Sequence, residues 1–395
     1  MLDELAEELS RIGLQAGLDA VGFAGAEPFE LARAVIERRS RDGLADSMQF
    51  TYRNPARATD PSRSLPGAAA LVVGARRYLR QDPAADPTTP EGPASVPARV
   101  ARYAWVDHYQ PLRQALRRIA ERLEDGGFAT RVLVDDNALV DRAAAHRAGL
   151  GWFGRNTNLL LPGAGSWFVL GSVVTDAPLP SGHPVTESCG SCRRCVPACP
   201  TGALSDDGAL DARRCLAWLV QAPGPFPVEH REALGDRIYG CDTCQEVCPV
   251  NRRAERSDPP VPAEVGATAV ADALDLLRSS DEQLLARWGR WYIAERDPRH
   301  LRRNALIVLG NVADGHNPAV LRALRASLRS EDPLLRGHAV WAAARVGCAE
   351  LAGELADDPD PFVASEVARV GSVTARSGSV RALPDKLTVD PHLPC

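Results

Sequence analysis

The sequence predicts a mixed α/β fold, followed by a cysteine-rich module and a helical C-terminal part. Helix-like and strand-like segments alternate in the first 180 residues, eight cysteines lie between Cys189 and Cys248, and helical patterning returns after about residue 265. A chain of 395 residues with 45 % hydrophobic content is long enough for several cores. We therefore expect an α/β domain over residues 1–180, a cluster module over 181–260, helical repeats over 261–370 and a flexible tail over 371–395.

The elements of the first part follow from apolar periodicity. Helices are expected up to Gly17, over residues 29–43 and over residues 108–127. Short apolar segments predict strands over residues 18–24, 68–78 and 130–136. The fold class is therefore α/β or α+β. Residues 80–99 are rich in proline and polar residues, so they predict a surface loop.

The C-terminal part contains a loose internal repeat. An Asp-Pro pair followed by an Ala-rich helical segment starts at Asp297, Asp332 and Asp360. The spacing of this unit is about 35 and then about 28 residues, which indicates HEAT-like helical hairpins.

Charge and hydropathy limit the possible partners. The net charge of -5 means that nucleic acid can bind only to a local basic face. The N-terminus lacks the pattern of a secretory signal, and no apolar run reaches the roughly 18 residues that span a bilayer. We expect a cytoplasmic protein without a membrane contact. The candidates for a basic face are Arg299, Arg302, Arg303, Arg322, Arg325, Arg329 and Arg336.

The cysteine spacing is the most specific feature of the chain. Residues 189–200 follow C-x2-C-x2-C-x3-C-P, the spacing of bacterial ferredoxins with two 4Fe-4S clusters. Three thiolates in one tight loop bind one cluster, and the fourth reaches its neighbour. A second run, Cys241-x2-Cys244-x3-Cys248-Pro249, lacks one cysteine, which Cys215 can supply. Zinc knuckles also pair C-x2-C, but they require neither the third cysteine nor the proline.

This spacing predicts two ligand sets. One cluster is expected on Cys189, Cys192, Cys195 and Cys248, and the other on Cys199, Cys215, Cys241 and Cys244. The isolated Cys348 and Cys395 are expected to be inert.

Three further segments carry a resemblance to a known family. Residues 134–176, 237–251 and 302–311 resemble epoxyqueuosine reductases, the cobalamin-dependent enzymes of tRNA queuosine biosynthesis. Residues 19–29 and the segment starting at Leu65 share the likeness, which spans nearly the whole chain in the same order.

The resemblance implies an activity and its partners. The N-terminal domain would hold cobalamin without a protein ligand to cobalt, and the two clusters would pass it electrons from an external donor such as flavodoxin or ferredoxin. The helical repeats would help to grip the tRNA anticodon arm, and the protein would act as a monomer. The epoxide of epoxyqueuosine at the wobble position would be reduced to queuosine, with two electrons, two protons and loss of water.

The resemblance also implies roles for individual residues. Asp135 matches the family's acid and would protonate the epoxide oxygen. The alternative is that Asp135, or its neighbour Asp136, caps the next helix. Arg142 would contact cobalamin or lie on a solvated helix face. The full expected set of cobalamin contacts is Arg57, Asp135, Arg142, Asn156, Ser166, Leu170 and Gly171.

The family pattern is not matched everywhere, and two other functions compete. Arg155 stands where the family usually has lysine, and the order of His108 and Tyr109 is reversed. A cobalamin-dependent reductive dehalogenase would also combine a corrinoid with two clusters, but commonly with a twin-arginine signal and without the helical repeat. A pure electron-transfer protein would leave residues 134–176 without a role.

Overall fold

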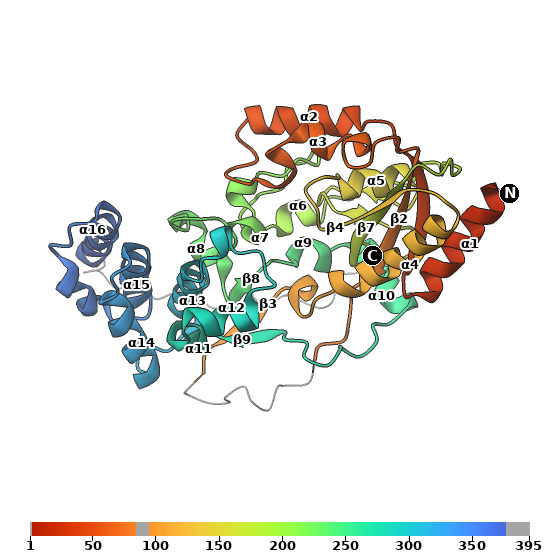
Figure 1. Ribbon diagram of the computed structural model, residues 1–395. Helices are drawn as coiled ribbons and strands as arrows, with labels where there is room; N and C mark the ends of the chain where they lie inside the picture. Colours follow the sequence, from red (N-terminus) through yellow and green to blue (C-terminus); the bar gives the residue numbers. More distant parts are fainter. Residues whose placement is uncertain (1, 84–94, 377–395) are drawn as a thin grey trace.

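The computed structural model of the chain describes residues 2–83 and 95–376. The N-terminal lobe and the C-terminal helices lie at opposite ends of an elongated molecule, with the cysteine-rich segment between them (Figure 1). Helices and strands mix throughout the first 270 residues, which confirms the predicted mixed class.

The N-terminal lobe is built on a four-stranded sheet of order β1-β2-β7-β4. Its strands are β1 (Ala20–Gly25), β2 (Ala70–Arg77), β7 (Phe168–Thr175) and β4 (Thr130–Val134). Every neighbouring pair is antiparallel, so the lobe is α+β rather than a parallel α/β fold. The end of β4 and the start of β7 therefore lie at the same edge of the sheet.

Helices cover both faces of this sheet. Helices α1 (Leu2–Gln15) and α4 (Tyr109–Asp125) cover one face, where Leu116 and Ile119 pack on fully buried strand residues. Helix α5 (Asp141–Arg147) covers the other face, while α2 (Glu30–Arg41) and α3 (Pro55–Ala58) lie above it. The predicted helices and strands of this lobe are confirmed, and their ends shift by up to two residues.

A second sheet joins three distant segments of the chain. Strand β3 (Pro97–Val100) lies between β8 (Arg237–Tyr239), to which it is parallel, and β9 (Val270–Asp272), to which it is antiparallel. The prediction of a surface loop up to residue 99 is therefore wrong at its end, because Ala98 and Val100 are buried between these strands. The central part of that predicted loop, residues 84–94, lies outside the described residues.

The cysteine-rich segment consists of short helices joined by loops. They are α6 (Cys195–Ala198), α7 (Leu216–Leu219), α8 (Val228–Leu234), α9 (Thr243–Glu246) and α10 (Pro249–Ser257). In the N-terminal lobe, a small hairpin of β5 (Trp152–Phe153) and β6 (Leu159–Leu160) precedes β7.

Six helices form most of the C-terminal part of the described chain. They are α11 (Ala273–Arg278), α12 (Asp281–Trp288), α13 (Arg299–Val312), α14 (Pro318–Leu328), α15 (Pro333–Arg345) and α16 (Pro361–Arg376). Helix α16 continues past residue 370, where the tail was expected to begin. The predicted tail beyond residue 376, with Cys395, lies outside the described residues.

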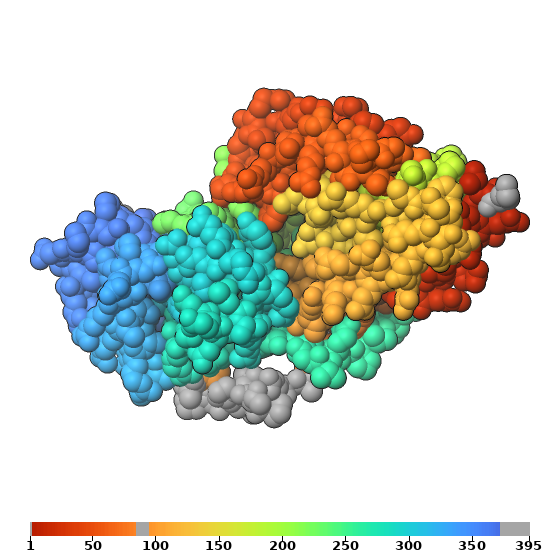
Figure 2. Space-filling view, in the orientation of Figure 1, coloured from red at the N-terminus to blue at the C-terminus, as the bar shows by residue number. Residues whose placement is uncertain are grey.

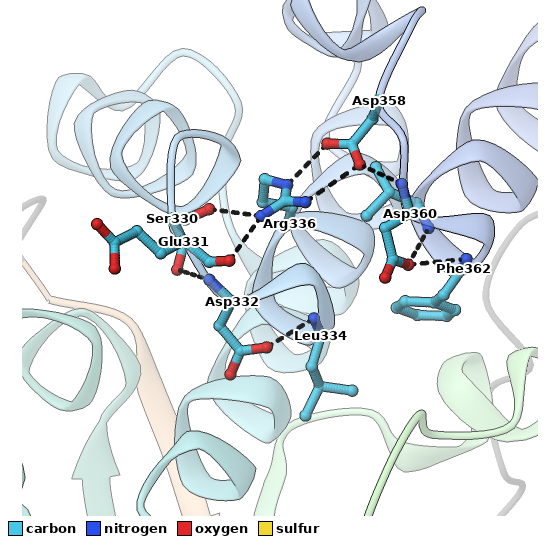
Figure 3. A network of polar contacts seen from close by, with 9 residues as sticks. Ser330, Glu331, Asp332, Leu334, Arg336, Asp358, Asp360 and Phe362 are labelled. Carbon is cyan, nitrogen blue, oxygen red and sulfur yellow. Dashed lines mark hydrogen bonds and ion pairs between the residues drawn. The ribbon is translucent and has the colours of Figure 1, made fainter.

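The repeated Asp-Pro pairs have a local physical role. The Asp332 carboxylate accepts a hydrogen bond from Leu334 N at 2.8 Å, and Asp360 accepts one from Phe362 N at 2.9 Å (Figure 3). Each aspartate therefore satisfies an amide of the first helical turn, and the following proline suits a position that needs no donor. No helix of the described chain is long and apolar enough to cross a membrane.

Candidate functional site

The eight clustered cysteines converge in space. Cys195 begins α6, and the other three of the first four flank that helix. Cys215 precedes α7. Cys244 lies in α9, which packs on α6, and Cys241 and Cys248 flank α9. All of them are free thiols of intermediate exposure. Within the described residues, no three His, Cys, Asp or Glu side chains form a site for a single metal ion.

One group of four thiols lies around Cys195. Burial raises the pKa of Cys195, and the neighbouring thiols of Cys189, Cys248 and Cys192 raise it further. Burial also raises the pKa of Cys248, with contributions from Cys189 and Cys192. The four cysteines expected to share one cluster are thus electrostatic neighbours.

The other four thiols form a second group. Burial raises the pKa of Cys215 to about 11, and Cys241 and Cys199 add to the rise. Burial raises the pKa of Cys244 well above its ordinary value, and Cys241, Cys215 and Cys195 contribute. Crowded thiols of this kind lose their protons readily only when a cationic centre compensates the charge, so both groups fit iron–sulfur clusters.

A backbone donor and a side-chain hydroxyl acceptor contact two sulfurs of the second group. Ala203 N donates a hydrogen bond to Cys199 Sγ at 3.2 Å, and Thr243 Oγ1 lies 3.5 Å from Cys241 Sγ. Hydrogen bonds to the sulfurs are one of the means by which a protein sets a cluster potential.

A buried polar network joins the cysteine module to the N-terminal sheet. Gln245 Nε2, in α9, donates to Tyr78 Oη at 3.0 Å and to the Ser166 carbonyl at 3.1 Å. Asn251 Oδ1 accepts from Ser166 N at 2.8 Å. A Cβ atom at Gly165 would lie 2.3 Å from that same Oδ1, so glycine is required at this contact. The network fixes the thiols relative to the edge of the sheet.

Asp135 stands at that edge, directly after β4. Its φ of 51° is in the left-handed region, which is strained for a non-glycine residue. Its carboxyl is exposed, yet desolvation raises its pKa, with further increases from Asp107 and Asp136 and an opposing effect of Arg113. Solvent therefore reaches the carboxyl from one side while protein surrounds it on the others.

The alternative role of this aspartate pair is excluded by the backbone. Helix α5 begins at Asp141, and its N-cap residue Val140 has no side-chain capping bond. Asp136 Oδ1 instead accepts a hydrogen bond from Ala138 N at 2.8 Å. Neither Asp135 nor Asp136 caps the helix.

Figure 2 shows a recess on the surface where the segments near residues 50–60, 135–150 and 285–295 meet. Arg142, exposed on α5, lowers the pKa of its neighbour Asp141, the first residue of that helix, and Arg57 is exposed on α3. Neither guanidinium makes a hydrogen bond or an ion pair within the described residues. Both are free to bind a ligand.

The other four predicted contacts are engaged by the protein. Buried Asn156 donates to the Cys244 carbonyl at 3.4 Å, and Ser166 belongs to the network with Gln245. Leu170 is half-buried in β7, next to Gly171. A Cβ at Gly171 would lie 2.8 Å from Leu116 Cδ1, so helix packing accounts for this glycine.

Sequence reasoning missed three groups near Asp135. Desolvation raises the pKa of Asp141 well above its ordinary value, Asp135 raises it further, and its Oδ1 has no hydrogen-bond partner among the described residues. Burial also raises the pKa of Tyr109 and Tyr239, and Asp135 contributes to both increases. No pattern in the sequence distinguishes Asp141, because an aspartate in a first helical turn usually complements the helix dipole.

The predicted basic face needs correction at three positions. The Arg302 side chain is 16 % exposed, donates to the Ser279 carbonyl at 2.8 Å and pairs with Asp281 at 2.6 Å. Arg303 and Arg336 are also engaged by the protein. Arg303 is fully buried and donates to backbone carbonyls of residues 219–224. The Arg336 side chain is 15 % exposed and bonds Asp358 together with the carbonyls of Ser330 and Glu331 (Figure 3). All three guanidiniums are therefore used for internal contacts rather than for a solvent-facing surface.

Known proteins match both the module and the whole chain. The family model described as a 4Fe-4S double cluster binding domain matches residues 188–251. An epoxyqueuosine reductase of Xanthomonas campestris is 35 % identical, over 87 % of this chain and 97 % of that relative. The corresponding relative in Bacillus cereus is 32 % identical, over 87 % of this chain and 90 % of its own length.

Solved structures agree with this match. An epoxyqueuosine reductase bound to an epoxyqueuosine-modified stem loop of tyrosine tRNA superposes with a TM-score of 0.84 at 28 % identity, covering 95 % of this chain and all of that one. A Bacillus subtilis epoxyqueuosine reductase, in which the loop with a catalytic aspartate is swung out of the active site, gives a TM-score of 0.83 at 27 % identity, covering 94 % of this chain and all of that one.

The cysteine arrangement and the matched domain define an iron–sulfur oxidoreductase. Identity and coverage then settle the particular kind. The chain belongs to the epoxyqueuosine reductase family.

Proposed function

We propose that this protein reduces epoxyqueuosine to queuosine at the wobble position of tRNA. The observation that carries the proposal is the position of Asp135, an exposed carboxyl with a raised pKa at a sheet edge that a buried network ties to eight clustered thiols. The relative solved with an epoxyqueuosine-modified stem loop supports the same substrate.

Two 4Fe-4S clusters would carry the electrons. We assign one to Cys189, Cys192, Cys195 and Cys248, and the other to Cys199, Cys215, Cys241 and Cys244. The mutual electrostatic effects within each group of thiols support this division, and the effect of Cys195 on Cys244 supports an electron path between the groups. Flavodoxin or ferredoxin would supply single electrons to a monomeric, cytoplasmic enzyme.

The recess is the proposed cobalamin site. Cobalamin, when bound, would supply the low-potential centre that delivers two electrons to the epoxide. The exposed guanidiniums of Arg57 and Arg142 fit its amide and phosphate groups, because neither has a protein partner within the described residues. Leu170 and Gly171 would contribute backbone from β7, and Asn156 and Ser166 would lie on the side of the thiols.

Asp135 would act as the general acid. Its raised pKa keeps a larger protonated fraction at neutral pH than an ordinary carboxyl has. The proton goes to the epoxide oxygen as the ring opens; with two electrons and a second proton, that oxygen leaves as water. Asp135 is exposed and has a left-handed backbone, so a splayed nucleotide would be able to reach its carboxyl.

The C-terminal helices would hold the RNA. The capped Asp-Pro turns before α13, α15 and α16 support a HEAT-like repeat. Arg322 and Arg325 are exposed on α14 and suit phosphate contacts.

The test is anaerobic turnover by the protein loaded with clusters and cobalamin. Wild type should convert epoxyqueuosine tRNA and leave tRNA with an unmodified wobble base unchanged, as followed by mass spectrometry of nucleosides. Asp135→Asn should lose about 10²- to 10⁴-fold in rate. Asp136→Asn, which keeps the turn bond to Ala138, is the matched control and should retain activity. Full activity of Asp135→Asn would reject the acid, and no conversion by wild type would reject the function.

A further inference from the structure

Two aromatic rings from distant segments form a contact that we name the aromatic step. Phe50 belongs to the short 3-10 helix η1 (Phe50–Tyr52), and Tyr292 follows α12. Their ring centroids are 4.7 Å apart at an interplanar angle of 59°. Tyr292 is 41 % exposed, whereas Trp288 and Trp291 of the same segment are 2 % and 5 % exposed. The segment therefore buries two of its rings and presents the third to solvent.

Contacts with Trp218 and Tyr239 hold both residues of the step in place. Trp218 meets Phe50 edge-on at 5.9 Å, and its Nε1 donates to Asp46 Oδ2 at 2.7 Å. The Tyr292 carbonyl accepts a hydrogen bond from Tyr239 Oη at 3.0 Å. The rings are thus fixed before any ligand binds, which reduces the entropy cost of stacking on them.

The backbone at the step is strained on both sides. Phe50 has a φ of 21°, and Glu295 and Arg296, just after Tyr292, have φ values of 56° and 55°. Non-glycine residues in these conformations persist only where the surrounding structure holds them, and they cluster at ligand sites.

Tyr239 connects the step to the proposed acid. Its hydroxyl donates a hydrogen bond to the Tyr292 carbonyl, and the charge of Asp135 contributes to the raised pKa of its phenol. Arg290 lies two residues before Tyr292, and the charge of Asp107 opposes the lowering of its pKa by burial and adds to the raised pKa of Asp135. The segments that carry the step also border the recess (Figure 2). The segments that carry the step and the segment after β4 therefore border one recess.

We propose that the Phe50–Tyr292 step stacks an unmodified base next to the modified nucleotide of the RNA substrate. This inference rests on the proposed function. A wobble base that reaches Asp135 must leave the anticodon stack, which exposes the face of its neighbour. An exposed aromatic ring can compensate that loss for any base, because every base has a π face.

The charge around the step favours RNA over a protein partner. Arg53, three residues after Phe50, is exposed, and its side chain makes no hydrogen bond or ion pair within the described residues. The guanidinium of Arg290 lies over the buried rings of Trp288 and Trp291 and donates to the carbonyls of Ala104 and Trp105, so Arg53 is the arginine that can reach a phosphate beside the step. Aromatic rings interleaved with arginine are the usual composition of a surface that binds single-stranded nucleic acid.

The protein side of the test compares three variants of the loaded, full-length chain. Binding of an epoxyqueuosine-containing anticodon hairpin is measured by fluorescence anisotropy. Tyr292→Leu should weaken binding by about 5- to 100-fold, and Tyr292→Phe should stay within about twofold, because only the ring is needed. Leu31→Ala removes an apolar side chain that is 81 % exposed on α2 and should bind as wild type does.

The RNA side removes the base instead of the ring. A hairpin that is abasic at the nucleotide on either side of the modified one is bound to wild type; one of the two should show the loss seen with Tyr292→Leu. Combining the two changes should add little further loss, since both remove one contact. The dependence of binding on salt should stay as in wild type, because no phosphate contact changes.

Several outcomes would overturn the inference. Equal affinity of wild type for both abasic hairpins and the intact one refutes stacking without any protein variant, so misfolding of Tyr292→Leu cannot hide the answer. Fully additive losses also refute it, as does unchanged affinity of a folded Tyr292→Leu. If wild type converts epoxyqueuosine RNA while any of these holds, only the stacking role fails. If wild type neither binds nor converts the RNA, both proposals fail.

Discussion

We predict that Arg303 stabilises the fold rather than binding RNA. The residue was expected on a phosphate-binding face, but its guanidinium is buried under residues 219–224. It donates to the carbonyls of Ala222, Gly224 and Leu219 at 2.7, 2.6 and 3.0 Å. These residues follow Cys215 directly, so Arg303 supports the segment that would bring this thiol to its cluster.

The magnitude follows from those three bonds. Each hydrogen bond to a charged donor contributes about 1.5–3 kcal/mol, and water that enters the site can replace part of the sum. We expect Arg303→Met to lower the free energy of unfolding by about 3–5 kcal/mol. With a slope of about 3 kcal/mol/M, the urea midpoint should fall by at least about 1 M.

The assay is urea unfolding followed by circular dichroism, with iron and sulfide analysis of the same samples. The control is Arg299→Met on the same helix, where the side chain is 43 % exposed and paired with Asp297. An exposed pair contributes at most about 1 kcal/mol, so this variant should unfold near wild type. The structural role would be refuted by a wild-type urea midpoint in Arg303→Met together with a reduced salt dependence of RNA binding.

Three further predictions concern the thiols and buried carboxyls. Cys215→Ser should lower the iron content from about eight to about four per chain, while Cys348→Ser should keep all of it; iron analysis of anaerobic protein decides. Glu366→Gln should cost about 3–5 kcal/mol, because Arg231 bonds both Glu366 oxygens at 2.8 and 2.9 Å with neither side chain more than 2 % exposed; an unchanged urea midpoint would contradict it. The folded protein holds the Asp141 proton more tightly than the unfolded chain does, because its pKa is raised. Stability from this group is therefore full below the ordinary carboxyl pKa and falls as pH rises toward the raised value. Asp141→Asn should flatten that decline in urea midpoints measured from pH 4 upward, and an unchanged slope would show that Asp141 does not titrate there.

The sequence determined the local elements and the chemistry of the thiols. Apolar periodicity predicted the helices of the N-terminal lobe because each has one buried face, and a continuous apolar run predicted β2 because it is buried on both faces. Cysteine spacing predicted two groups of four, since short gaps constrain which thiols share a loop. Cys215 was assigned to the group of Cys241 and Cys199 because it was the last unassigned thiol within reach of them, and its electrostatic neighbours agree with that assignment.

What the sequence could not predict depends on long-range packing. Strand β3 was hidden by flanking prolines, and its partners lie more than a hundred residues away. Arg303 and Arg299 on α13 look alike in sequence, but Arg303 is buried under residues 219–224 and the Arg299 side chain is 43 % exposed. The difference arises because burial depends on which helix face meets the neighbouring segment. Asp141 and Tyr239 approach Asp135 only in the folded chain.

The three-stranded sheet has a consequence for biosynthesis. Strand β3 must wait for β8, 137 residues later along the chain when counted from Val100 to Arg237. At about 5–20 residues per second, a ribosome needs roughly 7 to 27 s to make the partner. The first four cysteines emerge within that interval, but both proposed ligand sets are completed only by cysteines that follow β8, so neither cluster can be complete before β3 has its partner. Throughout that interval the nascent chain carries an unpaired strand that is open to chaperones and proteases.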